Sequence, residues 1–155
     1  MGYYPILVDV SKLRCVVIGG GPVADRRVDG LLNAGAAVTL ISPEITDGLR
    51  ELADKGVVRH VARRYAAGDL AECEMVFLAT DDVTVNEAVL SEARSRGIWT
   101  NCADDPENCD FILPAVVRRG ELMVAISTGG ASPATTRAIR EELELYLTAE
   151  HTQLL

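Results

Sequence analysis

A glycine-rich turn between a strand-like run and a helix-like run constrains this chain more than any other feature. The apolar run at 15–19 leads directly into Gly19-Gly20-Gly21-Pro22-Val23-Ala24, which fits the pattern G-x-G-x-x-A. The first glycine permits a tight turn, the second lets the backbone approach a diphosphate, and the last small residue allows close packing of helix and strand. A helix N-terminus also offers free N–H groups, so the turn predicts dinucleotide binding, with a purely structural tight turn as the alternative.

Short β-rich runs alternate with segments of helical period over the first 110 residues. We expect strands at 15–19, 37–41, 57–61, 75–80 and 98–102, and helices at 23–34, 45–55 and 83–96. Gly35, Gly56 and Gly97 stand where these helices should end, and Asp82 can cap the third. The alternation is typical of a parallel sheet covered by helices, so residues 1–110 are predicted to form a Rossmann-type, doubly wound α/β domain with helices on both faces.

The pattern changes in residues 111–155. Two strand-like runs, 111–117 and 122–127, are joined by only four residues, which is too short for a crossover helix and therefore predicts an antiparallel hairpin. Ser132-Pro133 is a strong helix start, and we expect that helix to reach about residue 148.

Composition excludes several classes of function. The chain has 15 basic and 23 acidic residues, a formal charge of -8, which argues against a nucleic-acid binder. Its apolar runs are far shorter than the roughly 20 residues that cross a bilayer, so we expect no membrane segment and a cytoplasmic location. The four cysteines form no C-x-x-C pair and there are two histidines, so we expect reduced thiols and no resident metal site.

Polar residues follow the predicted second and fourth strands, at the sheet edge where ligands of this fold bind. Ser42-Pro43-Glu44 stands where an acidic residue often holds the adenosine ribose. Glu44 there would accept a bond from the 2′-hydroxyl and repel a 2′-phosphate, favouring NAD over NADP. A solvent-facing glutamate at a helix start is the alternative. Thr80 ends the fourth strand, and Asp82 after it is more readily explained as a helix cap.

Two further segments carry chemistry-bearing groups. Asp104 follows the fifth strand among other acids, Asp105, Glu107 and Asp110, which could hinder its ionisation and favour proton transfer near neutral pH. The loop 127–133 holds three hydroxyls, two glycines and a helix start, and can hold an anion. The alternative is that Ser132 only caps the following helix and that Gly129 and Gly130 only form the turn.

Taken together, these residues resemble the precorrin-2 dehydrogenase family, including the N-terminal dehydrogenase and ferrochelatase part of siroheme synthase. The resemblance spans residues 3–147. It is carried by Tyr4-Pro5-Ile6, the turn 19–24, Ala79-Thr80-Asp81-Asp82 with Val85-Asn86, the segment 101–106, Phe111-Ile112-Leu113-Pro114 and the segment 124–133. The glycine turn alone is common, but this ordered combination is specific.

The resemblance implies NAD-dependent oxidation of precorrin-2 to sirohydrochlorin and, in the bifunctional members, insertion of ferrous iron. Whether this chain inserts a metal, and whether that metal is iron or cobalt, stays open. Asp104 matches the essential aspartate and is implied as the general acid or base. The implied cofactor contacts are Gly19, Gly21, Pro22, Val23, Ser42, Pro43, Glu44 and Thr80. The implied tetrapyrrole contacts are Asn101, Ser127, Thr128 and Gly129. The hairpin and helix at 111–155 are implied to form a dimerisation and substrate segment of a homodimer.

Precorrin-2 carries eight carboxylates while the chain is acidic, so local arginines must bind it. Arg118 and Arg137 are the favoured candidates, and Arg119 and Arg140 lie beside them; a solvated surface is the alternative for each. Family members usually continue into a further helical region, whereas this sequence stops at Leu155, so we expect that region to be missing. Two rival functions stay open: a regulatory NAD-sensing domain, and a chelatase without dehydrogenase activity.

Overall fold

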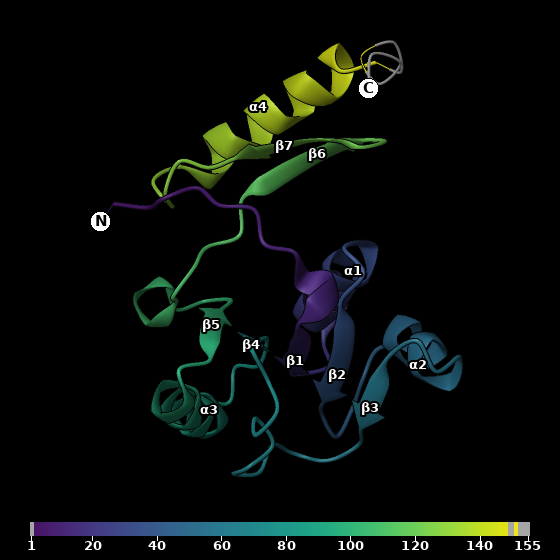
Figure 1. Cartoon of the computed structure of the whole chain (residues 1–155), viewed down its shortest axis with the longest axis vertical. Helices are drawn as coiled ribbons and strands as arrows, with labels where there is room; N and C mark the ends of the chain where they lie inside the picture. The colour runs from purple at the N-terminus through teal and green to yellow at the C-terminus, as the bar shows by residue number, and fades with distance from the viewer. Residues whose placement is uncertain (1, 149–150, 152–155) are drawn as a thin grey trace. The chain divides into compact units, whose positions relative to one another are not determined.

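Five parallel strands form the central sheet in the order β3-β2-β1-β4-β5 (Figure 1). The strands are β1 Arg14–Ile18, β2 Ala37–Ile41, β3 Arg59–Val61, β4 Met75–Leu78 and β5 Trp99–Cys102. The chain adds β2 and β3 on one side of β1, then returns to add β4 and β5 on the other. This reversal between β1 and β4 is a topological switch point, the place where open α/β sheets bind ligands.

The computed structural model describes residues 2–148 and residue 151 of the 155. It divides into two units, one of residues 6–111 and one that joins the N-terminal five residues to the segment from Ile112 onward. The first unit holds the parallel sheet, and the second holds the antiparallel hairpin and the last helix.

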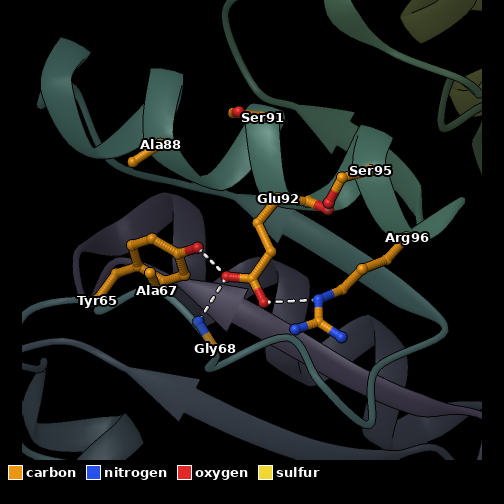
Figure 2. Close-up of a pocket in the computed structure, with 8 residues that line it drawn as sticks. All are labelled: Tyr65, Ala67, Gly68, Ala88, Ser91, Glu92, Ser95 and Arg96. Carbon is orange, nitrogen blue, oxygen red and sulfur yellow. Dashed lines mark hydrogen bonds and ion pairs between the residues drawn. The ribbon is translucent and has the colours of Figure 1, made fainter.

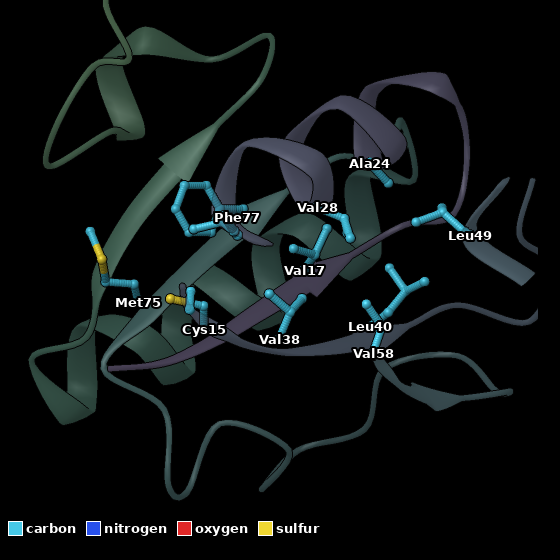
Figure 3. Packing of buried hydrophobic residues seen from close by; sticks show 12 residues of the cluster. Cys15, Val17, Ala24, Val28, Val38, Leu40, Leu49, Val58, Met75 and Phe77 are labelled. Atoms are coloured by element: carbon cyan, nitrogen blue, oxygen red, sulfur yellow. The ribbon is translucent and has the colours of Figure 1, made fainter. Parts of the chain in front are cut away.

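Helices cover both faces of the parallel sheet, as the sequence predicts. They are α1 Pro22–Asn33, α2 Asp47–Asp54 and α3 Val83–Arg96. Alternate residues of each strand point to opposite faces, so β1 sends Val17 to one core and Ile18 to the other. The first core contains Val28 of α1 and Leu49 of α2 (Figure 3), and the second contains Val89 of α3.

Local hydrogen bonds explain where these elements differ from the expected bounds. Helix α2 begins at Asp47 because the Thr46 hydroxyl caps it, accepting the Leu49 N–H at 3.2 Å. Strand β3 begins at Arg59 because the N–H groups of residues 57 and 58 still donate to the Leu52 carbonyl of α2. Gly35 and Gly97 follow α1 and α3 with φ of 79° and 67°, the left-handed conformation that favours glycine.

The second unit contains an antiparallel hairpin and one helix (Figure 1). The hairpin pairs β6 Ala115–Arg119 with β7 Leu122–Ile126, and the helix is α4 Pro133–Tyr146. Gly120 opens the two-residue turn with φ 57°, as a tight hairpin requires. The predicted strand at 111–117 starts later, at Ala115, because Pro114 has no N–H and the Phe111 ring packs edge-on against Phe77 in the first unit.

Candidate active site

The N-terminus of α1 lies at the carboxyl end of β1, beside the switch point. Its cap residue, Gly21, has no side chain, and Pro22 at the first helical position has no N–H. The first bond within the helix runs from Asp25 N to the Gly21 carbonyl at 3.0 Å, which leaves the N–H groups of Val23 and Ala24 to an outside acceptor. By contrast, the other three α-helices in the described residues are capped by their own Thr46, Asp82 or Ser132 side chains.

The three glycines of the turn have different surroundings. A Cβ on Gly19 would lie 2.2 Å from the Ala79 carbonyl oxygen, and one on Gly20 would lie 1.9 Å from the Glu44 carbonyl oxygen. These two glycines therefore let the ends of β4 and β2 pack against the turn. A Cβ on Gly21 would meet nothing within 4 Å. The open position next to free N–H groups fits a diphosphate, which needs donors and close backbone approach.

The segment after β2 is held against the turn by backbone bonds. Thr46 N donates to the Gly20 carbonyl at 3.0 Å, and the Ser42 hydroxyl donates to the Glu44 carbonyl at 2.7 Å. Ser42 is buried and occupied with this contact, whereas Pro43 and Glu44 are exposed. Glu44 precedes α2 by three residues, so it lies outside the first turn of that helix, and a solvent-facing glutamate stays the alternative to a ribose contact. Its position beside Gly20 suits a ribose contact.

Thr80 lies where β4 ends, next to the glycine turn. Its hydroxyl accepts the Asp82 N–H at 3.2 Å, and its carbonyl accepts a bond from Asn86 Nδ2 at 2.9 Å. Asp82 caps α3 by accepting the Val85 N–H, as the sequence predicts. The buried Asn86 Oδ1 has no partner among the described residues, so this edge retains an acceptor that a ligand N–H could satisfy.

Asp104 lies on the same edge of the sheet as the glycine turn. The register aligns Ile18 with Leu78 and Leu78 with Cys102, so β1, β4 and β5 end level. Asp104 follows β5 by two residues and is exposed. With neighbouring strands about 4.8 Å apart, β5 lies about 10 Å from β1, so Asp104 and the glycine turn lie near each other on this edge.

Two of the acids near Asp104, Asp105 and Asp110, make hydrogen bonds within the first unit. Asp110 accepts the Thr100 N–H at 2.8 Å and donates its own N–H to the Thr100 carbonyl at 2.9 Å, which turns the chain back along β5. Asp105 accepts a bond from Asn108 Nδ2. Asn101, expected to face the substrate, is 4% exposed; its Nδ2 donates to the Phe111 carbonyl at 3.0 Å, while its Oδ1 has no partner among the described residues.

In the second unit, the loop 127–132 is organised by its own hydroxyls. Thr128 Oγ1 accepts the Ser132 N–H at 3.0 Å and lies 3.2 Å from Thr136 Oγ1. The Ser127 hydroxyl accepts the Gly129 N–H at 3.0 Å, and Ser132 caps α4 through the Thr135 N–H. The capping and turning roles that the sequence left as the alternative are therefore present.

The four arginines considered for substrate carboxylates have different neighbours. Arg119 holds the C-terminal end of α4, donating to the Leu147 carbonyl at 3.0 Å and the Glu144 carbonyl at 2.8 Å. The sequence pattern gave no sign of this role. Arg137 pairs with Glu141 and Arg140 with Glu144. Arg118 is exposed and has no side-chain bond within the described part of the chain.

A hollow of about 760 Å³ lies between α3 and the segment 65–68, and it contains none of the expected site residues (Figure 2). Glu92 at its base accepts bonds from the Tyr65 hydroxyl and the Gly68 N–H and pairs with Arg96. Burial raises the pKa of Glu92, but these contacts outweigh it and lower the net pKa. Burial and the same hydrogen bond raise the pKa of Tyr65. The network joins the loop to α3 and was not predicted.

The described residues show no group of three or more His, Cys, Asp or Glu side chains arranged to hold a metal ion. Over the same residues, no helix has both the length and the apolar character needed to cross a bilayer.

Fold and site define a dinucleotide-binding domain of the doubly wound class. The NAD(P)-binding family model matches residues 6–115, and the model for the sirohaem biosynthesis protein central region matches residues 119–144. A solved structure described as SirC, precorrin-2 dehydrogenase, has a TM-score of 0.82 and 32% identity and covers 97% of this chain and 74% of that chain. The chain belongs to the precorrin-2 dehydrogenase family, and the resemblance expected from its residues is confirmed.

Siroheme synthases are also similar. The protein of Nitrosococcus oceani is 40% identical over 154 residues, which cover 99% of this chain and 33% of the relative. The protein of Methylococcus capsulatus is 44% identical over 144 residues, 93% of this chain and 30% of the relative. The chain therefore spans about a third of the length of these curated relatives.

Proposed function

We propose that this chain is an NAD-dependent dehydrogenase that oxidises precorrin-2 to sirohydrochlorin in siroheme biosynthesis. The observation that carries the proposal is the open position of Gly21 beside the uncapped N-terminus of α1. Family membership supplies the substrate, because the similar solved structure is described as a precorrin-2 dehydrogenase. The location of Glu44 beside the turn favours NAD over NADP, since its carboxylate would repel a 2′-phosphate.

In this proposal NAD, when bound, supplies the hydride acceptor, and the chain supplies binding and proton transfer. The N–H groups of Val23 and Ala24 hold the diphosphate, and the Glu44 carboxylate accepts a hydrogen bond from a ribose hydroxyl. Thr80, two residues after β4, would orient the nicotinamide. The Asp104 carboxylate accepts the proton that leaves the macrocycle, and its exposure lets it reach a substrate at the sheet edge.

Tetrapyrrole binding by the second unit is part of the same proposal. Arg118 is the arginine best suited to a substrate carboxylate, because the other three are engaged inside the unit. Arg137 would have to leave Glu141 to contribute. Ser127, Thr128 and Gly129 would offer polar groups from an ordered loop. Asn101, in the first unit, stays a predicted tetrapyrrole contact.

We further propose that the second unit mediates homodimer formation. Val117 is the buried residue of its two strands, and α4 buries none. Leu145 and Tyr146 of α4 are 84% and 68% exposed. A two-stranded hairpin with one helix is marginal alone, so a second copy is the partner that would bury these side chains. Sedimentation should give twice the chain mass, and a concentration-independent monomer would contradict the proposal.

The direct test is an anaerobic incubation with precorrin-2 and NAD, followed by the absorbance of sirohydrochlorin, beside the same reaction with NADP. We expect turnover with NAD, and turnover lowered by about 10²–10⁴-fold in Asp104→Asn with NADH binding unchanged. No product with either nucleotide would refute the proposal. If the chain binds NADH and its response to that ligand is the same in Asp104→Asn, it would instead be the regulatory sensing domain.

Metal insertion is a separate hypothesis, with ferrous iron or cobalt as substrate. Gly21→Asp should abolish oxidation; if metal insertion into supplied sirohydrochlorin survives in that variant, the two activities are separable. A cytoplasmic location also stays a prediction.

A further inference from the structure

Two of the four cysteines flank the loop that carries Asp104 and meet at its base. Cys102 ends β5, and Cys109 follows the short 3₁₀ helix η2, Pro106–Asn108. The Cys109 sulfur lies 3.0 Å from the backbone nitrogen of Cys102 and 3.3 Å from its carbonyl oxygen. The Cys102 sulfur in turn lies 3.8 Å from the carbonyl oxygen of Asn108, the residue that precedes Cys109, so the two thiols lie in the same small region at the base of the loop.

We propose that Cys102 and Cys109 form a reversible disulfide on exposure to a peroxide, and that this bond moves the Asp104 loop out of its working geometry. The Cys109 sulfur attacks one oxygen of hydrogen peroxide, the O–O bond breaks, the thiol proton passes to the departing oxygen, and the products are a sulfenic acid and water. The Cys102 thiol then attacks that sulfur, the S–S bond forms, and a second water leaves. Two thiols and one peroxide thus give one disulfide and two waters.

The surroundings of the two sulfurs assign the order of the steps. Cys109 is half-buried, and its sulfur can accept the Cys102 N–H and, at 3.8 Å, a bond from Asn101 Nδ2. Its partial exposure lets a peroxide reach this sulfur first. Cys102 is buried, and burial, with Cys109 and Asp105 next to it, raises its pKa to about 12, which suits the second, resolving thiol.

The disulfide would remove contacts that hold the loop. In the reduced chain the Cys109 S–H lies 3.3 Å from the Cys102 carbonyl and 3.3 Å from the Asp105 carbonyl, and it can donate to either. A disulfide sulfur has no hydrogen, so it can donate to neither carbonyl, and the Asp105 carbonyl next to Asp104 is released. A displacement of about 1 Å of a reacting group can lower a rate by about 10²-fold.

The first measurement needs no activity. The reduced full chain is treated with hydrogen peroxide, unfolded and alkylated, and its intact mass and peptides are measured. We expect two of the four thiols to escape alkylation and a cross-link between the peptides of Cys102 and Cys109. Cys73→Ser is the matched control and should form the same bond, because Cys73 contacts the Met75 carbonyl instead. Cys109→Ser and Cys102→Ala should not form it.

Four alkylated thiols after peroxide, or a bond that involves Cys15 or Cys73 or joins two chains, would overturn the inference. Its consequence for catalysis rests on the proposed function. There, oxidation should lower turnover of precorrin-2 by about 10²-fold, dithiothreitol should restore it, and the Kd for NADH should not change. Full turnover in the cross-linked chain would refute the effect on the loop. Absence of turnover in the reduced chain would refute the proposed function. The mass measurement would still decide whether the cross-link forms.

Discussion

Replacing Gly21 by Asp should abolish dinucleotide binding and leave the fold intact. Gly21 has φ -86° and ψ -170°, an extended conformation open to any residue, and its Cβ would meet nothing within 4 Å. Asp is also a preferred helix cap, better than glycine by a few tenths of a kcal/mol, and favourable to the helix dipole by about 0.3–1 kcal/mol. The melting temperature should therefore stay constant or rise by about 1–3 °C.

The same carboxylate should exclude the diphosphate for two reasons. It can accept hydrogen bonds from the Val23 or Ala24 N–H groups that the phosphate needs, and it adds a negative charge beside the negative diphosphate. One pair of charges 4 Å apart at a partly exposed site costs about 4 kcal/mol. That is about 10³-fold in Kd, and allowing for side-chain rotation and salt we expect a loss of at least about 10²-fold.

Calorimetric titration with NADH and a thermal melt of the same samples measure the two effects. Gly30→Asp is the matched control, because Gly30 also meets nothing within 4 Å and adds the same charge to the same helix. It lies nine residues further on, about 13 Å along the axis, beyond the screening length in physiological salt. Unchanged NADH affinity in Gly21→Asp, or equal losses in both variants, would show that the diphosphate does not bind beside residue 21.

Three other substitutions test neighbouring parts of the account. Gly20→Ala should destabilise the chain by about 1–3 kcal/mol or more, because its Cβ would overlap the Glu44 carbonyl; an unchanged urea midpoint would contradict this. Glu44→Gln should weaken NAD and strengthen NADP binding, so an unaltered ratio of the two Kd values would remove Glu44 from the ribose site. Arg119→Ala should lower stability by about 1–3 kcal/mol and speed amide exchange at the end of α4, while the exposed Arg118→Ala should not.

Most of the first unit follows from local sequence signals. The strands, the helices and the parallel order are predictable because buried β-rich runs, a glycine after α1 and α3, and the Asp82 cap are short-range features. The glycine turn was predictable for the same reason, since tight turning and close approach each need a particular small residue. Family membership was predictable from the order of several such motifs.

Long-range contacts were not predictable from these signals. The bond from Tyr65 to Glu92 joins residues 27 positions apart, and the Arg119 contact with Glu144 joins residues 25 apart. In a sequence, arginine and glutamate are expected to be solvent-exposed surface residues, so neither contact is indicated. Similarly, Asp110 reads as one more acid near Asp104, but the fold uses it to bind the Thr100 backbone. Individual site roles therefore stay predictions, because they depend on ligand contacts.

A crystal structure with NADH bound would show whether the glycine turn holds the diphosphate. We expect the diphosphate within about 3.2 Å of the Val23 or Ala24 nitrogen, the adenosine ribose against the Glu44 carboxylate, and the nicotinamide between the ends of β4 and β5 facing Asp104. A diphosphate bound elsewhere, for instance in the hollow beside Glu92, would contradict it.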